Sequence, residues 1–303
     1  LASSRWLGRG QKEEGDGAAV DAMRAHFDTV DIDGLVIIGE GEKDEAPMLY
    51  NGERVGTGRG PSVDVAVDPV EGTRLLALGK ANAISVISLS PRGTMFDPGP
   101  AFYMNKLVVP SEAKGKVRLG DPVKKTLQTV ATALGKRVED LVVFVLDKER
   151  HHKLIADIRA AGARIQLHTD GDVAGALMAV MPNTGIDLMM GSGGTPEGIL
   201  AATAIRVAGG EMQGQLDPQS DAERTAVLKA GYDLDRVMTE SEMVTTNDVL
   251  FAATGITDGS FLPGVTVTDK GVYTSTIVFN GANGTIRNIQ SHYRSGIMTD
   301  YVL

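Results

Sequence analysis

The spacing of apolar positions along the chain predicts alternating helices and strands. Ala18, Val20, Met23 and Phe27 recur at near-helical spacing, which predicts a helix over residues 16–30. Short apolar runs bounded by turn residues predict strands. The predicted strands are 35–38, 63–67, 83–89, 104–109, 141–146, 163–167, 186–190, 249–253, 272–279 and 285–289, and further helices are predicted over 127–134, 152–161, 173–181 and 196–207.

The order of these elements predicts an α/β fold class. Strands and helices alternate strictly from residue 141 to residue 207, which favours a largely parallel sheet in that part of the chain. The residues before and after this stretch are richer in strands. We therefore expect an N-terminal α+β half over residues 1–140, carrying most of the candidate metal ligands, and a C-terminal α/β half over residues 141–303, with both halves forming one catalytic unit.

Composition and charge narrow the class of protein. The 303 residues include no cysteine, which excludes thiol nucleophiles, disulfides and zinc-thiolate sites, so a metal would have to bind oxygen or imidazole. A net charge of −9 disfavours binding to nucleic acids or anionic membranes. No apolar run approaches the roughly 18 residues that cross a bilayer, and the first 15 residues lack the apolar stretch of a signal peptide. We expect a cytoplasmic protein.

Carboxylates recur where apolar segments stop or helices start. Brought together, such side chains would form an all-oxygen site suited to Mg²⁺ or Mn²⁺, because hard cations prefer carboxylate ligands. For any one of these acids taken alone, a solvated loop position is the more common interpretation. The candidate acids are Asp16, Glu40, Glu42, Asp68, Glu71 and Glu197.

The most specific segment is Asp68-Pro69-Val70-Glu71-Gly72-Thr73. It follows a strand of the buried type, places two carboxylates three residues apart and ends in a hydroxyl group. Gly72 would let the backbone approach a ligand closely. On these residues alone, an Asp-Pro turn with Thr73 as the N-cap of a helix is an equally good interpretation.

This segment and Gly39-Glu40-Gly41-Glu42 resemble the metal-dependent, lithium-sensitive sugar and inositol phosphatases, whose signature is D-P-[IV]-[DE]-G-T. A narrower resemblance follows from further strings that occur in order along nearly the whole chain. They are similar to the class II fructose-1,6-bisphosphatases of the GlpX type, which implies the layered α/β sandwich of that superfamily. The strings are WLGRG at 6–10, DGAAV at 16–20, GEGEKDEAPMLY at 39–50, TDGDVA at 169–174 and GGTPEG at 193–198.

The resemblance implies a role for each matching residue. Asp16 and Glu40 would hold one Mg²⁺ or Mn²⁺ ion, and Asp68, Glu71 and Glu197 a second, since two divalent ions can stabilise both oxygens of a phosphoryl displacement. Thr73 would orient the attacking water without becoming phosphorylated. Glu42 would assist as an acid or base, and Lys12 would stabilise a phosphate or the nucleophile.

The resemblance also implies a set of substrate contacts. Lys148 and Arg150 would bind the sugar phosphate, and Tyr103 would contact the second phosphate. Asp170 and Asp172 would accept hydrogen bonds from sugar hydroxyls, although Asp172 is also a candidate N-cap. Gly72, Thr73, Gly171 and Gly194 complete the expected substrate-binding residues. The five histidines are expected to be structural or on the surface.

One string departs from the family pattern. Where the family usually reads G-R-G-D-K, this chain has Gly8-Arg9-Gly10-Gln11-Lys12. The family's carboxylate beside Lys12 is therefore lost. If that acid orients Lys12 or belongs to the outer shell of a metal, activity or metal affinity is reduced here.

The expected function is metal-dependent hydrolysis of the 1-phosphate of fructose 1,6-bisphosphate to fructose 6-phosphate and phosphate, in gluconeogenesis and glycerol metabolism, by a homo-oligomer, either a dimer or a tetramer. A sedoheptulose 1,7-bisphosphatase or a dual-specificity enzyme is the nearest alternative. An inositol or nucleotide monophosphatase is disfavoured by Lys148 and Arg150 if these bind a second phosphate. A non-catalytic sugar-phosphate sensor is an alternative from a different class, and Gln11 adds to its weight.

Overall fold

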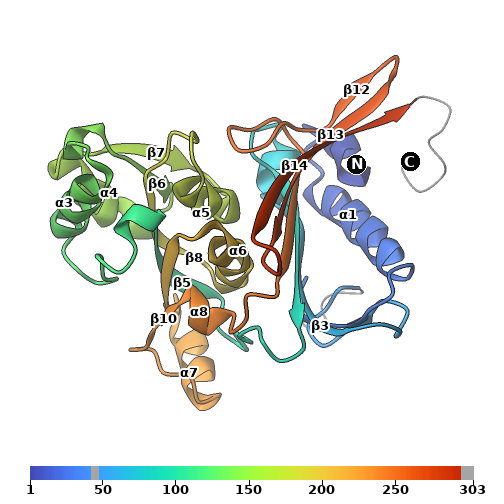
Figure 1. The fold of residues 1–303 in the computed structure, drawn as a ribbon, viewed down its shortest axis with the longest axis horizontal. Helices are drawn as coiled ribbons and strands as arrows, with labels where there is room; N and C mark the ends of the chain where they lie inside the picture. The colour runs from blue at the N-terminus through green and yellow to red at the C-terminus, as the bar shows by residue number, and fades with distance from the viewer. Residues whose placement is uncertain (42–47, 295–303) are drawn as a thin grey trace. The chain divides into compact units, whose positions relative to one another are not determined.

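A computed structural model describes residues 1–41 and 48–294, and the chain divides into two compact units. Unit 1 contains Leu1–Met95 and Thr246–Leu303, and unit 2 contains Phe96–Thr245 (Figure 1). The expected division at residue 140 differs from this arrangement, because that position lies inside unit 2, between η3 (Val138–Asp140) and β6 (Val142–Leu146). The difference arises from pairing between distant segments, since the C-terminal strands join the sheet that the N-terminal strands build.

Unit 1 is built on an eight-stranded sheet with the order β12-β13-β11-β4-β3-β1-β2, in which β14 also pairs with β13. The C-terminal strands enter it through β11, which pairs antiparallel with β4. The parallel pairing is between β1 and β3. The elements are η1 (Ala2–Trp6), α1 (Lys12–Phe27), β1 (Asp33–Ile38), β2 (Arg54–Val55), β3 (Ser62–Glu71), α2 (Thr73–Ala77), β4 (Ile84–Pro91), β11 (Leu250–Gly255), β12 (Thr266–Thr268), β13 (Gly271–Asn280) and β14 (Thr285–Arg294).

Helix α1 covers part of this sheet. Its buried side chains Val20 and Phe27 belong to the same apolar cluster as Val36 of β1 and Val65 of β3. Removing these side chains from water stabilises the unit in proportion to the apolar area that they bury. The helix begins at Lys12, four residues before the predicted start, so Asp16 lies one turn inside it.

Unit 2 is built on a six-stranded sheet with the order β10-β9-β5-β8-β6-β7. Strand β6 pairs in parallel with β7 and with β8, whereas the pairs β5–β8, β5–β9 and β9–β10 are antiparallel. The expectation of a largely parallel sheet was therefore wrong. The elements are β5 (Tyr103–Val109), η2 (Ser111–Ala113), α3 (Val123–Leu134), η3, β6, η4 (Glu149–His151), α4 (His152–Ala160), β7 (Arg164–His168), α5 (Asp172–Val180), β8 (Leu188–Gly194), α6 (Thr195–Ala208), β9 (Glu211–Leu216), α7 (Asp221–Lys229), β10 (Val237–Thr239) and α8 (Glu240–Met243).

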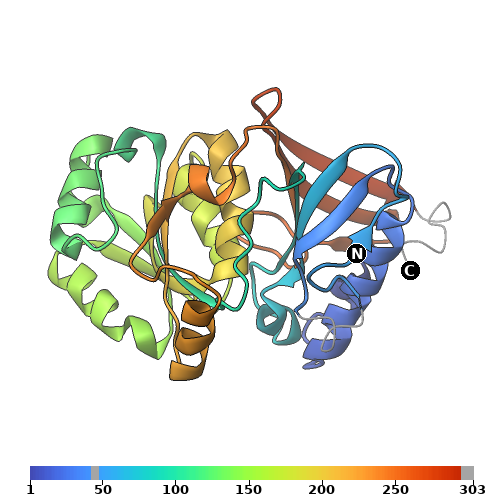
Figure 2. The ribbon, with the colours of Figure 1, turned by 90° about the horizontal axis from the view of Figure 1, so that it is seen from below.

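Helices cover both faces of the unit 2 sheet (Figures 1 and 2). On one face, Leu127 of α3 and Ile158 of α4 pack with Leu107 and Val143 of the sheet. The other face is covered by α5 and α6, which contact each other and β8. Gly198 of α6 lies so close to the sheet that a Cβ there would be 3.2 Å from Lys106 Cε of β5. The α/β fold class is thus confirmed.

Most predicted strands and helices are present, and each differs from its prediction by a few residues at the ends. The elements after residue 210 of unit 2, namely β9, α7, β10 and α8, had no prediction. Strand β9 has polar residues at alternate positions, and two of them, Glu211 and Gln213, are buried and hydrogen-bonded to the loop after β5. In the described part of the chain, no helix has the length and apolar character needed to cross a membrane.

Candidate active site

Two of the predicted metal ligands meet in unit 1. Asp16 lies on α1 and Glu40 in the turn after β1, and their carboxyl groups are hydrogen-bonded to each other. Burial raises the pKa of Glu40 to about 8, and the charge and hydrogen bond of Asp16 add to the shift. Burial also raises the pKa of Asp16. Two carboxyl groups that share a proton in this way match a cation site, because a divalent ion would replace the proton and remove the repulsion.

The turn that carries Glu40 depends on Gly39. The backbone N–H of Glu40 donates to the carbonyl of Leu49 at 2.9 Å, and that of Gly39 donates to Asn51 Oδ1 at 3.0 Å. A Cβ on Gly39 would lie 1.8 Å from the Leu49 carbonyl oxygen, so any other residue would open the turn. Glu42, the predicted acid or base, lies outside the described residues.

The segment Asp68 to Thr73 combines a strand irregularity with a helix start. The ladder between β3 and β4 shifts register between Asp68 and Glu71, a stretch that includes Pro69, which cannot donate a ladder hydrogen bond. Glu71 is 3% exposed, and Asp68 is half-buried. Gly72, with φ of 89°, is the N-cap of α2, so Thr73 occupies the first helical position. The interpretation of Thr73 as an N-cap was therefore wrong.

Lys12 and Gln11 lie at the start of α1. Lys12 is exposed, and its charge offsets only part of the rise that burial causes in the pKa of Asp16, one turn further along the helix. Gln11 is the N-cap residue, and its side chain makes no capping hydrogen bond. Aspartate, the residue at this place in the motif that the chain resembles, is a better N-cap residue than glutamine.

A second cluster, the Lys106 cluster, is formed in unit 2 by Lys106, Asp172 and Glu197. Lys106 lies on the central strand β5 and is 2% exposed, and its Nζ is 2.5 Å from Asp172 Oδ2. Burial and the charge of Asp172 raise the pKa of Glu197, while Lys106 lowers it. Glu197 Oε2 is buried and accepts no hydrogen bond from the described residues. Such an oxygen fits a cation that arrives with substrate or solvent.

Lys106 was not among the predicted site residues, although the sequence carries a signal for it. Asn105 and Lys106 interrupt the run from Met104 to Val109, whose other residues are apolar and typical of a buried strand. A charged side chain in such a position is rarely fully buried unless it has a partner. The partner could not be identified, because Asp172 lies 66 residues further along the chain.

Glycines at the end of β8 make room for the Lys106 cluster. A Cβ on Gly193 would lie 2.0 Å from Asp172 Oδ2, and a Cβ on Gly194 would lie 1.7 Å from Glu197 Oε2. Both distances are far below a van der Waals contact. Gly194 was predicted to bind substrate, and in the structure it leaves space for the Glu197 carboxylate.

Arg150 and Tyr103 lie together, close to the backbone of β8. Arg150 Nε and Nη2 donate to the Ser192 carbonyl oxygen at 3.0 and 2.9 Å, and the guanidinium lies over the Tyr103 ring at 5.0 Å. His151 is buried, with Nδ1 2.7 Å from the Leu146 carbonyl oxygen and Nε2 accepting from the Ser192 N–H at 2.7 Å. The histidine therefore connects η4 to β8 and supports the position of Arg150, a structural role as expected.

Lys148 and Asp170 form an ion pair in which Nζ lies 2.9 Å from Oδ1. Asp170 Oδ2 is buried and accepts no hydrogen bond within the described residues. The following Gly171 has φ of 99° and is the N-cap of α5, which makes Asp172 the first helical residue. The interpretation of Asp172 as an N-cap was wrong, because its carboxylate is bound to Lys106 instead.

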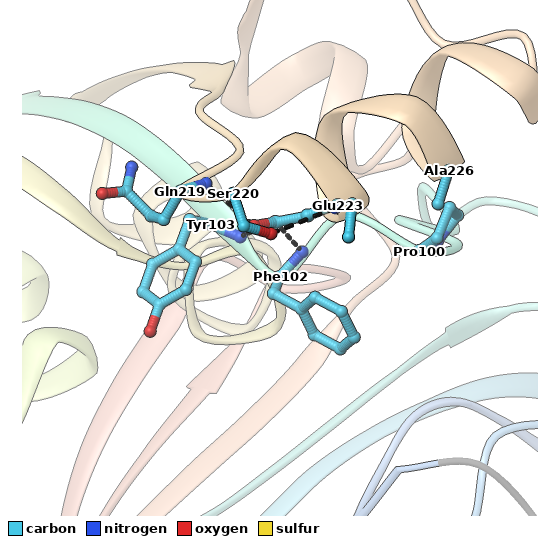
Figure 3. A pocket seen from close by; sticks show the side chains of 8 residues that line it. Pro100, Phe102, Tyr103, Gln219, Ser220, Glu223 and Ala226 are labelled. Carbon is cyan, nitrogen blue, oxygen red and sulfur yellow. Dashed lines mark hydrogen bonds between the residues drawn. The ribbon is translucent and has the colours of Figure 1, made fainter.

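The start of β5 is anchored by Glu223 of α7 (Figure 3). Its Oε1 accepts from the N–H groups of Phe102 and Tyr103 at 2.8 and 3.2 Å, and its Oε2 accepts from Gln219 at 2.8 Å. A pocket of about 480 Å³ lies here. Of the predicted substrate residues only Tyr103 lines it, so this pocket lies beside the predicted site and does not contain it.

The structure thus brings the predicted residues together in groups. Asp16 and Glu40 meet in unit 1, with Lys12 close to Asp16. In unit 2, Asp172 and Glu197 surround Lys106, Lys148 binds Asp170, and Arg150 covers Tyr103. Over residues 1–41 and 48–294, no group of three or more histidine, aspartate and glutamate side chains is arranged to hold a metal ion. The full set of five ligands stays a prediction.

An α/β fold with carboxylates at strand ends and helix starts, and with lysine and arginine beside some of them, is typical of metal-assisted phosphate ester hydrolases. The chain belongs to the family of bacterial fructose-1,6-bisphosphatases encoded by glpX, whose family model matches residues 1–293. This membership confirms the resemblance drawn from the motifs. The family is one of metal-dependent phosphoric monoester hydrolases, so the predicted enzyme class is confirmed as well.

Curated relatives agree with the family model. The chain is 44% identical over 307 residues to fructose-1,6-bisphosphatase 1 class 2 of Escherichia coli K12, an alignment that covers 97% of this chain and 91% of the relative. The identity and coverage are the same for the class 2 fructose-1,6-bisphosphatases of Escherichia coli O6:H1 and Shigella flexneri.

Proposed function

We propose that the protein hydrolyses the 1-phosphate of fructose 1,6-bisphosphate to fructose 6-phosphate and phosphate, as a step of gluconeogenesis. The observation that carries this proposal is the similarity to class 2 fructose-1,6-bisphosphatases over nearly the whole chain. The motif residues that the resemblance requires are present, apart from the acid replaced by Gln11.

Asp16 and Glu40 hold a divalent ion, either Mg²⁺ or Mn²⁺, in this proposal. Their shared proton and raised pKa values support the assignment, because the pair is a carboxylate site that is short of positive charge. When bound, a divalent ion stabilises negative charge that develops on phosphate oxygens. The assignment of Asp68, Glu71 and Glu197 to a second ion rests on the resemblance, and the buried Glu197 Oε2, which accepts no hydrogen bond from the described residues, supports it.

The remaining roles belong to side chains that bind and orient the substrate. Thr73 orients the attacking water through its hydroxyl. Arg150 donates two of its five N–H groups to the Ser192 carbonyl oxygen, and its guanidinium lies over the Tyr103 ring. These contacts hold the guanidinium in place to bind a phosphate. Asp170 has a carboxylate oxygen that can accept from a sugar hydroxyl, since only Oδ1 is engaged by Lys148.

Phosphate release tests the proposed function directly. With purified protein, fructose 1,6-bisphosphate and Mg²⁺ or Mn²⁺, one phosphate per sugar is expected, with fructose 6-phosphate as the product. A chelator is expected to stop the release and excess metal to restore it. Sedoheptulose 1,7-bisphosphate in the same assay decides between a single and a dual specificity. Binding of sugar phosphate without release at any metal concentration would identify a sensor and overturn the proposal.

The Asp16–Glu40 pair gives a pH dependence that can be measured on the metal-free protein. Because the folded pKa of Glu40 lies near 8, above its ordinary value of 4.5, the folded state binds more protons between these values. The protonated Glu40 therefore adds to the free energy of unfolding. Its contribution is complete below pH 4.5 and is lost as the pH rises towards 8. In chelator, the melting temperature of the wild type is expected to fall between pH 6 and pH 8 more steeply than that of Glu40→Gln. Added Mg²⁺ or Mn²⁺ is expected to raise the melting temperature at pH 8 more in the wild type than in Glu40→Gln, and parallel curves would contradict the assignment.

The cellular context is part of the proposal. We place the enzyme in the cytoplasm, where sugar phosphates are metabolised, and as a homo-oligomer, either a dimer or a tetramer. Light scattering behind size exclusion measures the oligomeric state, and a single species near the chain mass of 31.9 kDa would overturn that part alone.

A further inference from the structure

Lys106 is among the largest fully buried side chains of the described residues, and no other lysine or arginine there is buried. It lies on β5, between β8 and β9, on the face of the sheet that α5 and α6 cover. Its Nζ bonds to Asp172 Oδ2 at 2.5 Å, and its charge acts on Glu197. The residue therefore contacts a predicted substrate ligand and lies beside a predicted metal ligand.

A buried ion pair is a poor means of stabilising a fold, because desolvation of both charges offsets their attraction. An apolar side chain at position 106 would fill the same space without the free energy needed to remove two charges from water. The chain nevertheless keeps Gly193, Gly194 and Gly198 around the pair, each of which would clash with or crowd the cluster if it carried a Cβ. Several positions thus accommodate this one lysine and its two acids.

We propose that Lys106 is a positioning residue of the active site. It fixes the Asp172 carboxylate through Oδ2, so that Oδ1 is presented to a sugar hydroxyl. The inference rests on the proposed function, in which Asp172 binds the sugar. It deepens that function, because it makes substrate affinity depend on a side chain that does not contact the substrate.

A purely structural role is the competing explanation, since the pair also connects β5 to α5. The chain offers a matched control in Lys136, whose Nζ lies 2.5 Å from Asp187 Oδ1 in the same unit. Asp187 also accepts from the N–H of Val142, at the start of β6. Lys136 and Asp187 have no place in the proposed mechanism, so Lys136→Met removes an ion pair of equal length without touching the site.

The test uses steady-state kinetics on fructose 1,6-bisphosphate at saturating metal with Lys106→Met, Asp172→Asn, the double variant, Lys106→Arg and Lys136→Met. Lys106→Met is expected to raise KM at least tenfold and to change kcat much less. The double variant is expected to match Asp172→Asn alone, because the lysine acts through the aspartate. Lys106→Arg is expected to recover part of the loss, and Lys136→Met to lower the melting temperature while KM stays within twofold of the wild type.

The outcomes separate the two proposals. A wild type that releases no phosphate overturns the proposed function. A wild type that turns over, with Lys106→Met unchanged in KM or with effects that multiply in the double variant, overturns the positioning role. If Lys106→Met and the double variant both fail to fold while Lys136→Met folds, the pair is structural and the inference is wrong.

Discussion

Replacing Thr73 by alanine is expected to lower kcat for phosphate release by about 10²–10⁴, the usual range for a group that handles the proton or position of a nucleophile. Thr73 is half-exposed and follows Gly72, whose positive φ turns the chain from β3 into α2. Its hydroxyl therefore lies directly after the acidic segment Asp68 to Glu71. Since alanine is as compatible with a first helical turn as threonine, the fold and KM are expected to change little.

Thr73→Ser is the matched control. It keeps a hydroxyl at the same position and is expected to retain most of the turnover, although its side chain is less restricted in rotamer. Initial rates at saturating substrate and metal, with circular dichroism to check the fold, give the comparison. A Thr73→Ala enzyme that binds substrate and turns over at the wild-type rate would show that the water is oriented by another group.

Replacing Gly194 by alanine is expected to have an effect of similar size by a different route. The added Cβ would lie 1.7 Å from Glu197 Oε2, so the carboxylate or the end of β8 must move. Glu197 lies in the first turn of α6, whose first residue Thr195 is fully buried, so the backbone there has little freedom to adjust. We expect kcat/KM to fall at least a hundredfold, as removal of a catalytic electrostatic group usually costs, and the melting temperature to fall as well.

Glu197→Ala provides the comparison that isolates the cause. Removing the carboxylate removes the atoms with which the new Cβ would collide, so the Gly194→Ala/Glu197→Ala variant is expected to regain thermal stability relative to Gly194→Ala. Activity is not expected to return, because the predicted metal ligand is gone. Thermal melts of the wild type and the three variants measure this, and a double variant less stable than either single one would place the clash elsewhere.

Local patterns predicted the elements that carry the site better than the way those elements pair. The apolar runs at 104–109 and 186–190 correspond to β5 and β8, but nothing in either run indicates that the two strands pair antiparallel. The alternation of strands and helices favoured a parallel sheet, but only the pairs of β6 with β7 and with β8 are parallel in unit 2. Pairing depends on contacts between residues far apart in the chain, which no local period records.

The same limit applies to individual side chains. Glu40 and Asp16 were both selected as metal ligands from motifs, but their shared proton depends on the loss of solvent that folding imposes. Two roles were predicted for Asp172, sugar contact and N-cap. Its carboxylate does not cap the helix, because it is paired with the buried Lys106. Glu223, which holds the start of β5 beside Tyr103, was not predicted, and neither was its helix α7.

The sequence by itself determined the family, the enzyme class and the identity of the candidate ligands, because these depend on residue types in a fixed order along the chain. Only the tertiary structure decided which of them meet, which glycines make room for them and that a buried lysine holds Asp172. These properties arise from burial and close approach between distant segments, and burial is what turns an ordinary carboxylate or lysine into one with a defined partner and orientation.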